Sequence, residues 1–196
     1  MPPQPSPAAL EERLAAIVGA STWFMPALRA VQGLGLASWC IGAGAVRNLV
    51  WDVLHRHERP SFLSDVDVAY FDRDRLDPER DAELQRQLAA TLPGLPWEVT
   101  NQAAVHTWFE NCFGHAVAPL RSLDEAVASW PEYATSVGVY LRQDHSIGVI
   151  APYGLQDLFG MVVRRNPARV SVATYRERIE RKRYPERWPR VTIIPA

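Results

Sequence analysis

Two acidic side chains, Asp65 and Asp67, are separated by one residue in a strand-like segment, and Glu98 lies near the start of another. Side chains two apart on a strand point to the same face, so the two aspartates are expected to project together. Such a pair repels unless a cation neutralises it. Mg²⁺, with Mn²⁺ as the alternative, binds a few carboxylates together with substrate phosphates. The three carboxylates therefore suggest a metal site for phosphoryl chemistry.

Glu98 matters to this prediction because it would come from a neighbouring strand. A third carboxylate would let a second ion lie about 3.5–4 Å from the first, the separation used in in-line phosphoryl displacement. The competing interpretation is structural. Asp65 and Asp67 would then form the exposed polar start of a strand, and Glu98 would be a surface residue on an edge strand.

A glycine segment, Gly42-Ala43-Gly44, follows a short apolar run and precedes a helical pattern. Its glycines let the backbone approach a ligand closely, and the following helix offers its first N–H groups to phosphate oxygens. Arg47 is expected in the first helical turn, where it could meet the same phosphates or a nearby carboxylate. A tight turn without function is the alternative. A dinucleotide-binding fingerprint is set aside, because Arg47 stands where its third glycine belongs.

The segment from Ile41 to Phe71 resembles the head of the DNA polymerase β-type nucleotidyltransferase superfamily. It is most similar to tRNA CCA-adding enzymes and poly(A) polymerases, in which a Gly-Gly-x-x-Arg-Asp turn precedes an Asp-x-Asp strand. Here Ala43-Gly44-Ala45-Val46-Arg47-Asn48 and Asp65-Val66-Asp67-Val68 occupy those places. The sequence departs from the pattern at Ala43, which replaces the first glycine, and at Asn48, which replaces the acidic residue.

A longer resemblance, from about Trp39 to Pro195, is to a bacterial nucleotidyltransferase-like family of uncharacterised function. The stretches that carry it are Gly44–Asp52, Asp65–Phe71, Trp97–Ala103, Tyr133–Val139, Ala151–Phe159 and the region of Trp188-Pro189. This resemblance implies the polymerase β-like nucleotidyltransferase fold. That fold is α/β (α+β), with a mixed sheet flanked by helices.

The superfamily resemblance also implies roles for individual residues. Asp65 and Asp67 would bind the ion that travels with a nucleoside triphosphate, and together with Glu98 they would hold the catalytic ion. The implied nucleotide-binding residues are Gly42, Ala43, Gly44, Arg47 and Asn48. The expected activity is Mg²⁺-dependent transfer of a nucleoside monophosphate to an acceptor, which could be a small molecule, a protein or an RNA.

Two alternatives remain open. The chain could be a non-catalytic nucleotide-binding or regulatory module that keeps the fold, although such a module would not need all three carboxylates. It could also be an RNA-directed transferase that uses its basic C-terminal region. Residues 164–196 carry 10 Arg and Lys against three acidic residues, whereas residues 1–163 carry 11 against 19. A basic region can bind phosphates, or it can fold back on the acidic body.

Hydrophobic periodicity and turn residues predict the elements that position these residues. Helices are expected over 7–18, 22–31, 44–54, 78–92, 123–130, 155–161 and 172–182. Strands are expected over 37–41, 65–71 and 97–101, with a hairpin formed by 136–141 and 147–150. The basic helical segment covers about 164–190.

The length of 196 residues fits one domain, expected over 8–196 after a disordered proline-rich tail at 1–7. The tail lacks the features of a signal peptide, and no apolar run approaches the ~18 residues of a membrane span, so no membrane partner is expected. Two cysteines are too few for a disulfide framework, so we expect a cytoplasmic protein. The sequence leaves the oligomeric state open.

Overall fold

A computed structural model describes residues 5–196, and its first elements are two helices, α1 (Pro7–Ala20) and α2 (Phe24–Gln32). The Ser6 hydroxyl accepts a hydrogen bond from the Ala9 amide, and Pro7 occupies the first turn, where a missing N–H costs nothing. The helix therefore begins within the last two residues of the predicted tail. Residues 1–4 of that tail lie outside the described part of the chain.

The central sheet has five strands in the order β3-β2-β1-β4-β5. These are β1 (Trp39–Gly42), β2 (Val66–Tyr70), β3 (Trp97–Asn101), β4 (Gly138–Leu141) and β5 (Ile147–Ile150). Strands β2 and β3 run parallel, and every other neighbouring pair is antiparallel. The sheet is therefore mixed, as predicted, with β4 and β5 forming the predicted hairpin.

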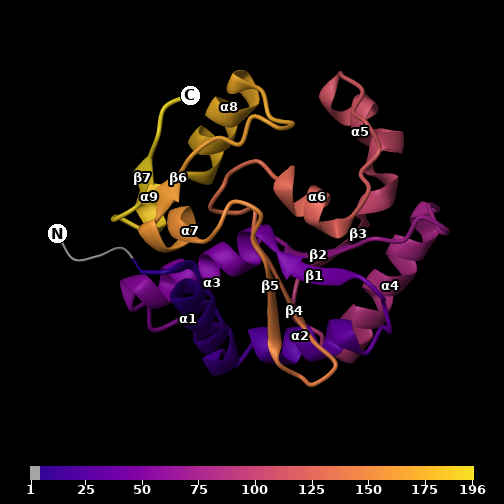
Figure 1. Ribbon diagram of the computed structural model, residues 1–196, viewed down its shortest axis with the longest axis horizontal. Coiled ribbons are helices and arrows are strands. Elements are labelled where there is room, and N and C mark those ends of the chain that lie inside the picture. Colours follow the sequence, from indigo (N-terminus) through magenta and orange to yellow (C-terminus); the bar gives the residue numbers. More distant parts are fainter. Residues whose placement is uncertain (1–4) are drawn as a thin grey trace.

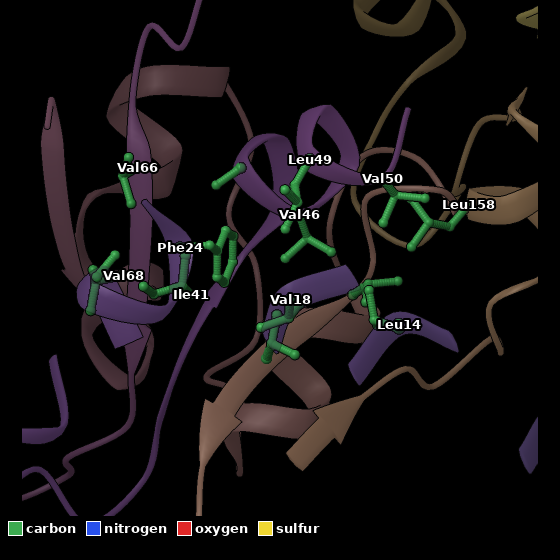
Figure 2. Packing of buried hydrophobic residues seen from close by; sticks show 14 of the residues in the cluster. Leu14, Val18, Phe24, Ile41, Val46, Leu49, Val50, Val66, Val68 and Leu158 are labelled. Atoms are coloured by element: carbon green, nitrogen blue, oxygen red, sulfur yellow. The ribbon is translucent and has the colours of Figure 1, made fainter. Parts of the chain in front are cut away.

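Helices α3 (Ala43–His55) and α4 (Pro78–Thr91) connect the first strands. Together with α1 and α2 they cover one face of the sheet and enclose the main core (Figure 1). Figure 2 shows this core, in which Ile41, Val66 and Val68 of the sheet pack near Phe24 and the α3 side chains. Val66 and Val68 point into this core, so Asp67 between them points to the opposite face.

The opposite face of the sheet is covered only in part, by helix α6 (Leu123–Ala128). A small cluster of Cys40, Ala69, Leu123, Ala126 and Val127 fills that contact. Helices α5 (Val105–Phe113) and α8 (Val172–Lys182) flank α6 on its two sides (Figure 1). The part of this face that α6 leaves uncovered carries the acidic residues.

The C-terminal segment folds back on the body of the molecule. After α7 (Gln156–Gly160), strands β6 (Val162–Val163) and β7 (Thr192–Ile193) pair in parallel around α8 and the short helix α9 (Tyr184–Arg187). Tyr184 and Trp188 are buried against Trp51 of α3. The basic segment is thus packed against the body, one of the two dispositions that its charge allowed.

The sequence expectations need correction in the α5 region and at Val53. The turn η1 (Gln102–Ala104) and helix α5 were not expected, although Val105, Phe109 and Phe113 recur at helical spacing. Val53, expected on the apolar side of α3, is 48% exposed because it lies in the last turn, beyond the buried stretch that ends at Asp52. No single described helix is long and apolar enough to cross a membrane; α1 and α2 would suffice only as a pair, and they are bent by 93°.

Candidate active site

The three predicted carboxylates line one cavity of about 270 Å³. Asp67 and Glu98 are direct partners in the parallel pairing of β2 with β3, so their side chains project from the same face of two strands that are about 4.8 Å apart. Asp65, just before β2, shares this face with Asp67, and its carboxylate accepts a hydrogen bond from the Ser64 hydroxyl at 2.9 Å. We call this space the acidic cavity.

Asp67 carries a charge that its surroundings do not compensate. Burial raises the pKa of Asp67 to about 7, and the negative charges of Asp65 and Glu98 add to the effect. Arg178 and Lys182 act in the opposite direction, but they do not outweigh it. Within the described residues, no ion pair involves any of the three carboxylates. The acidic cavity is therefore suited to a cation that the protein itself does not supply.

The donor set fits Mg²⁺ bound together with a phosphate ligand. Among residues 5–196, no three carboxylate, imidazole or thiol side chains are gathered into a ready-made metal site. Mg²⁺ does not require one, because it usually takes one or two carboxylates, substrate phosphates and water. The raised pKa of Asp67 is what a carboxylate pair shows when such a charge is missing.

The predicted glycine turn joins β1 to α3 at the edge of the acidic cavity. A Cβ on Gly42 would lie 2.3 Å from a ring carbon of Trp130, so any other residue would displace that ring. Ala43 has a φ of 49°, in the left-handed region that favours glycine. Ala43 thus stands where the nucleotidyltransferase pattern has its first glycine, and its backbone keeps the conformation that favours glycine. Gly44 leaves the space between Arg47 and Asp65 open.

Arg47 and Asn48 are buried at the start of α3 and contact each other. The Arg47 guanidinium donates to Asn48 Oδ1 at 2.7 and 3.2 Å and to the Tyr184 hydroxyl at 3.3 Å. Asn48 in turn donates to the Phe62 carbonyl. Asn48 therefore holds the guanidinium beside the Gly44 turn, and both residues line a second cavity.

This second cavity, of about 660 Å³, lies on the Asp65 side of the site. Gly44, Asp65 and Lys182 line both cavities and so form the boundary between them. Basic side chains dominate its wall, namely Arg47, Arg181, Lys182, Arg183 and Arg187. We call it the basic cavity. Its charge and its position beside a helix N-terminus suit a phosphate chain.

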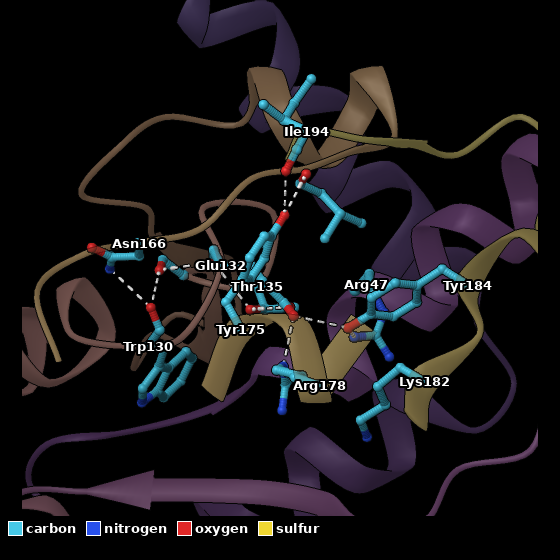
Figure 3. A network of polar contacts seen from close by, with 12 residues as sticks. Arg47, Trp130, Glu132, Thr135, Asn166, Tyr175, Arg178, Lys182, Tyr184 and Ile194 are labelled. Atoms are coloured by element: carbon cyan, nitrogen blue, oxygen red, sulfur yellow. Dashed lines mark hydrogen bonds and ion pairs between the residues drawn. The ribbon is translucent and has the colours of Figure 1, made fainter. Parts of the chain in front are cut away.

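A buried polar network, which the sequence analysis missed, supports α8 beside the acidic cavity (Figure 3). Glu132 is 1% exposed and accepts hydrogen bonds from Arg178 Nε at 2.6 Å and the Tyr184 hydroxyl at 3.0 Å. Burial would raise the pKa of Glu132, but the Arg178 guanidinium outweighs it and holds that pKa below its usual value. The only sequence signal was the place of Glu132 directly before the Tyr133–Val139 resemblance region.

The solved structure of a CCA-adding enzyme head domain, determined by NMR, is similar to this chain over nearly its whole length. The TM-score is 0.78 at 26% identity, covering 94% of this chain and 96% of that one. A CCA-adding enzyme in complex with CTP matches with a TM-score of 0.53 at 13% identity, which shows the shared fold. The chain spans 43% of that larger protein.

These similarities and the arrangement of glycine turn and strands define a nucleotidyltransferase fold. The family model for nucleotidyltransferases matches residues 29–193, and the chain belongs to this family. The predicted fold class and the prediction of a nucleotidyltransferase are therefore confirmed. No curated protein sequence matches the chain.

Proposed function

We propose that the chain transfers a nucleoside monophosphate from a nucleoside triphosphate to an acceptor hydroxyl, with Mg²⁺ held by Asp65, Asp67 and Glu98. The observation that carries the proposal is the raised pKa of Asp67 in a cavity that all three carboxylates line. An enzyme that binds its cation only together with the substrate would leave this charge uncompensated beforehand.

The triphosphate would lie in the basic cavity, against the N-terminus of α3. The left-handed backbone at Ala43 and the missing side chain at Gly44 give the phosphates access to the first N–H groups of the helix. Gly42 would act indirectly, since it allows Trp130 to pack against the turn. Arg47, held by Asn48, and Lys182 supply positive charge to the same space.

The carboxylates would orient the α-phosphate at the boundary between the basic and acidic cavities. Mg²⁺ bound there supplies charge neutralisation at the phosphates and lowers the pKa of the acceptor hydroxyl. The hydroxyl oxygen forms a bond to the α-phosphorus, the bond from that phosphorus to the bridging oxygen breaks, and pyrophosphate leaves. Lys182, which borders both the basic and the acidic cavity, would stabilise the negative charge of the departing pyrophosphate.

The test is calorimetric titration of the wild type with ATP, GTP, CTP and UTP, each with and without Mg²⁺. We expect at least one nucleotide to bind in a Mg²⁺-dependent way, and Asp67→Asn to remove that dependence. Asp157→Asn is the matched control, because Asp157 pairs with Arg164 away from the acidic cavity. Absence of Mg²⁺-dependent binding in the wild type would refute the proposal.

The alternative of a non-catalytic nucleotide-binding module keeps the same binding residues. Pyrophosphate release separates the two functions, because a module binds the triphosphate and Mg²⁺ without releasing pyrophosphate from any acceptor. The three carboxylates around one cavity favour turnover, since binding of a phosphate chain needs cations rather than an acidic cluster.

A further inference from the structure

A third cavity, of about 710 Å³, opens on the other side of Asp67 between α5 and α8. Residues that it shares with the acidic cavity include Asp67, Thr100, Gln102, Trp130 and Arg178. Asp65 and Gly44, by contrast, border the basic cavity. The reaction site thus has two entrances, one on the Asp65 side and one on the Asp67 side. We call the second entrance the aromatic cleft.

Two entrances, one bordered by Asp65 and the other by Asp67, with Arg181 at the edge of both, suit the geometry of an in-line displacement. The attacking and leaving oxygens lie roughly in line through the phosphorus, so the acceptor must approach from the side opposite to the pyrophosphate. If the triphosphate fills the basic cavity, the leaving group lies on the Asp65 side. The attacking hydroxyl then comes from the Asp67 side, where the aromatic cleft ends.

The wall formed by α5 is aromatic and open. Trp108 is 39% exposed and Phe113 is 52% exposed, and both line the cleft. Phe113 packs against Phe109 with ring centroids 4.5 Å apart, which holds its position. Exposed aromatic faces gathered in one concave site are suited to stacking on a planar ring, because such a ring removes them from water.

The other wall supplies positive charge. The Arg169 guanidinium lies 5.5 Å from the Phe109 ring centroid, and Arg181 of α8 is exposed at the edge of the cleft. Arg178 is engaged by Glu132, so it contributes less to a ligand. Glu177 partly offsets these charges. The cleft therefore combines a stacking surface with one or two cations.

We propose that the aromatic cleft is the acceptor site, and that the acceptor is a small hydroxyl-bearing compound with an aromatic ring and an anionic group. The inference rests on the proposed function and names its substrate class. The volume of the cleft lies within the ~300–1,000 Å³ of small-molecule sites. In the reaction the acceptor oxygen replaces pyrophosphate on the α-phosphorus and releases its proton to solvent.

The test uses AMP, GMP, CMP and UMP as probes, because each has an aromatic ring, an anionic group and free hydroxyls. Calorimetry measures their binding to protein saturated with Mg²⁺ and a non-hydrolysable ATP analogue, which blocks the basic cavity. We expect at least one probe to bind. Replacing the stacking surface by Trp108→Ala with Phe113→Ala should weaken it about 10- to 100-fold, since stacking contributes ~1–3 kcal/mol per base.

Tyr153→Ala is the matched control, because Tyr153 is an exposed aromatic residue that lines none of the three cavities. It should leave probe binding unchanged. Binding that persists in the Trp108 and Phe113 double variant, or no binding of any probe, would overturn the assignment. Hundredfold tighter binding of a hexaribonucleotide with a steep salt dependence would also overturn it in favour of an RNA acceptor.

The experiment separates failure of this inference from failure of the proposed function. The ATP analogue is titrated first, and the double variant should bind it with wild-type affinity because both residues lie outside the basic cavity. If neither the analogue nor any of the four nucleoside triphosphates binds with Mg²⁺, the proposed function is refuted. If it binds while the probes show no dependence on Trp108 and Phe113, only the acceptor assignment is refuted.

Discussion

Asp67 and Glu132 are two carboxylates withdrawn from solvent near the same helix, and their environments differ. Glu132 has Arg178, Tyr184 and Thr135 as hydrogen-bond donors, and its pKa is lowered. Asp67 faces two other carboxylates, and its pKa is raised to about 7. Arg178 thus forms its ion pair with Glu132, although it also lines the acidic cavity, where no cation pairs with Asp67 among the described residues.

This difference separates a structural carboxylate from a functional one. The Glu132 network fixes α8 against the body of the molecule and is complete without a ligand. The acidic cavity is complete only when a cation arrives, and strongly shifted pKa values of this kind are enriched at functional sites. Substitutions that remove the Glu132 charge, remove the Asp67 charge, or remove one of the two cations of α8 therefore test this difference.

Glu132→Gln should produce the largest effect, a loss of about 3–5 kcal/mol in the free energy of unfolding. The substitution leaves Arg178 largely buried without its partner, and removal of one member of a buried pair costs about that much. Urea unfolding monitored by circular dichroism measures it. Asp157→Asn, which breaks the more exposed pair with Arg164, should cost less than about 1 kcal/mol. Equal costs for the two variants would contradict the comparison.

Asp67→Asn should have the opposite sign and stabilise the metal-free protein by about 1–3 kcal/mol at pH 8. The folded-state pKa of about 7 lies above the ordinary aspartate pKa of 3.8, so the folded protein binds the proton more tightly than the unfolded chain does. The wild type therefore loses stability as the pH rises from about 4 to 7. Asparagine mimics the neutral acid, so the gain should vanish near pH 4.

Urea unfolding of the wild type and Asp67→Asn at pH 4, 6 and 8 tests this pH dependence. Added Mg²⁺ provides the internal control, since a ligand that binds only the folded state stabilises it. Mg²⁺ given together with a non-hydrolysable ATP analogue should stabilise the wild type at pH 8 and have less effect on the variant, whereas Mg²⁺ alone should have little effect on either. An unchanged or lower stability of the variant at pH 8 would show that Asp67 is compensated after all.

The face on which Asp67 lies was predictable from the sequence, because it depends on the local pattern of polar and apolar residues. Alternation of polar and apolar residues put Asp67 on the face opposite Val66 and Val68, and the parallel pairing of β2 with β3 placed Glu98 beside it. The strands of the sheet and most helices were predicted in the same way. Local periodicity is sufficient wherever one face of an element is buried.

The buried network around Glu132 was not predictable, because it depends on tertiary packing. Glu132 lies in a loop and meets Arg178 across 46 residues, and no periodicity specifies which direction α8 takes. Arg47 illustrates the same limit: its place at the glycine turn was predicted, but its contact with Tyr184 from α9 was not. The aromatic cleft was missed for a different reason. Its α5 wall has helical spacing that the analysis overlooked.

The two cations of α8, Arg178 and Lys182, lie one helical turn apart and give the smallest but most specific prediction. Burial and the charges of Arg178 and Arg47 lower the pKa of Lys182, which borders both the acidic and the basic cavity. Lys182→Ala should weaken binding of Mg²⁺ and nucleoside triphosphate about tenfold, the value of ~1.4 kcal/mol. It should leave stability nearly unchanged, because the substitution also relieves repulsion between like charges.

Arg178→Ala should show the reverse, with unfolding at lower urea and a smaller change in affinity, because its guanidinium is bonded to Glu132. Calorimetry and urea unfolding of both variants measure the two effects, and equal losses of affinity would remove the distinction between a structural and a substrate-binding cation.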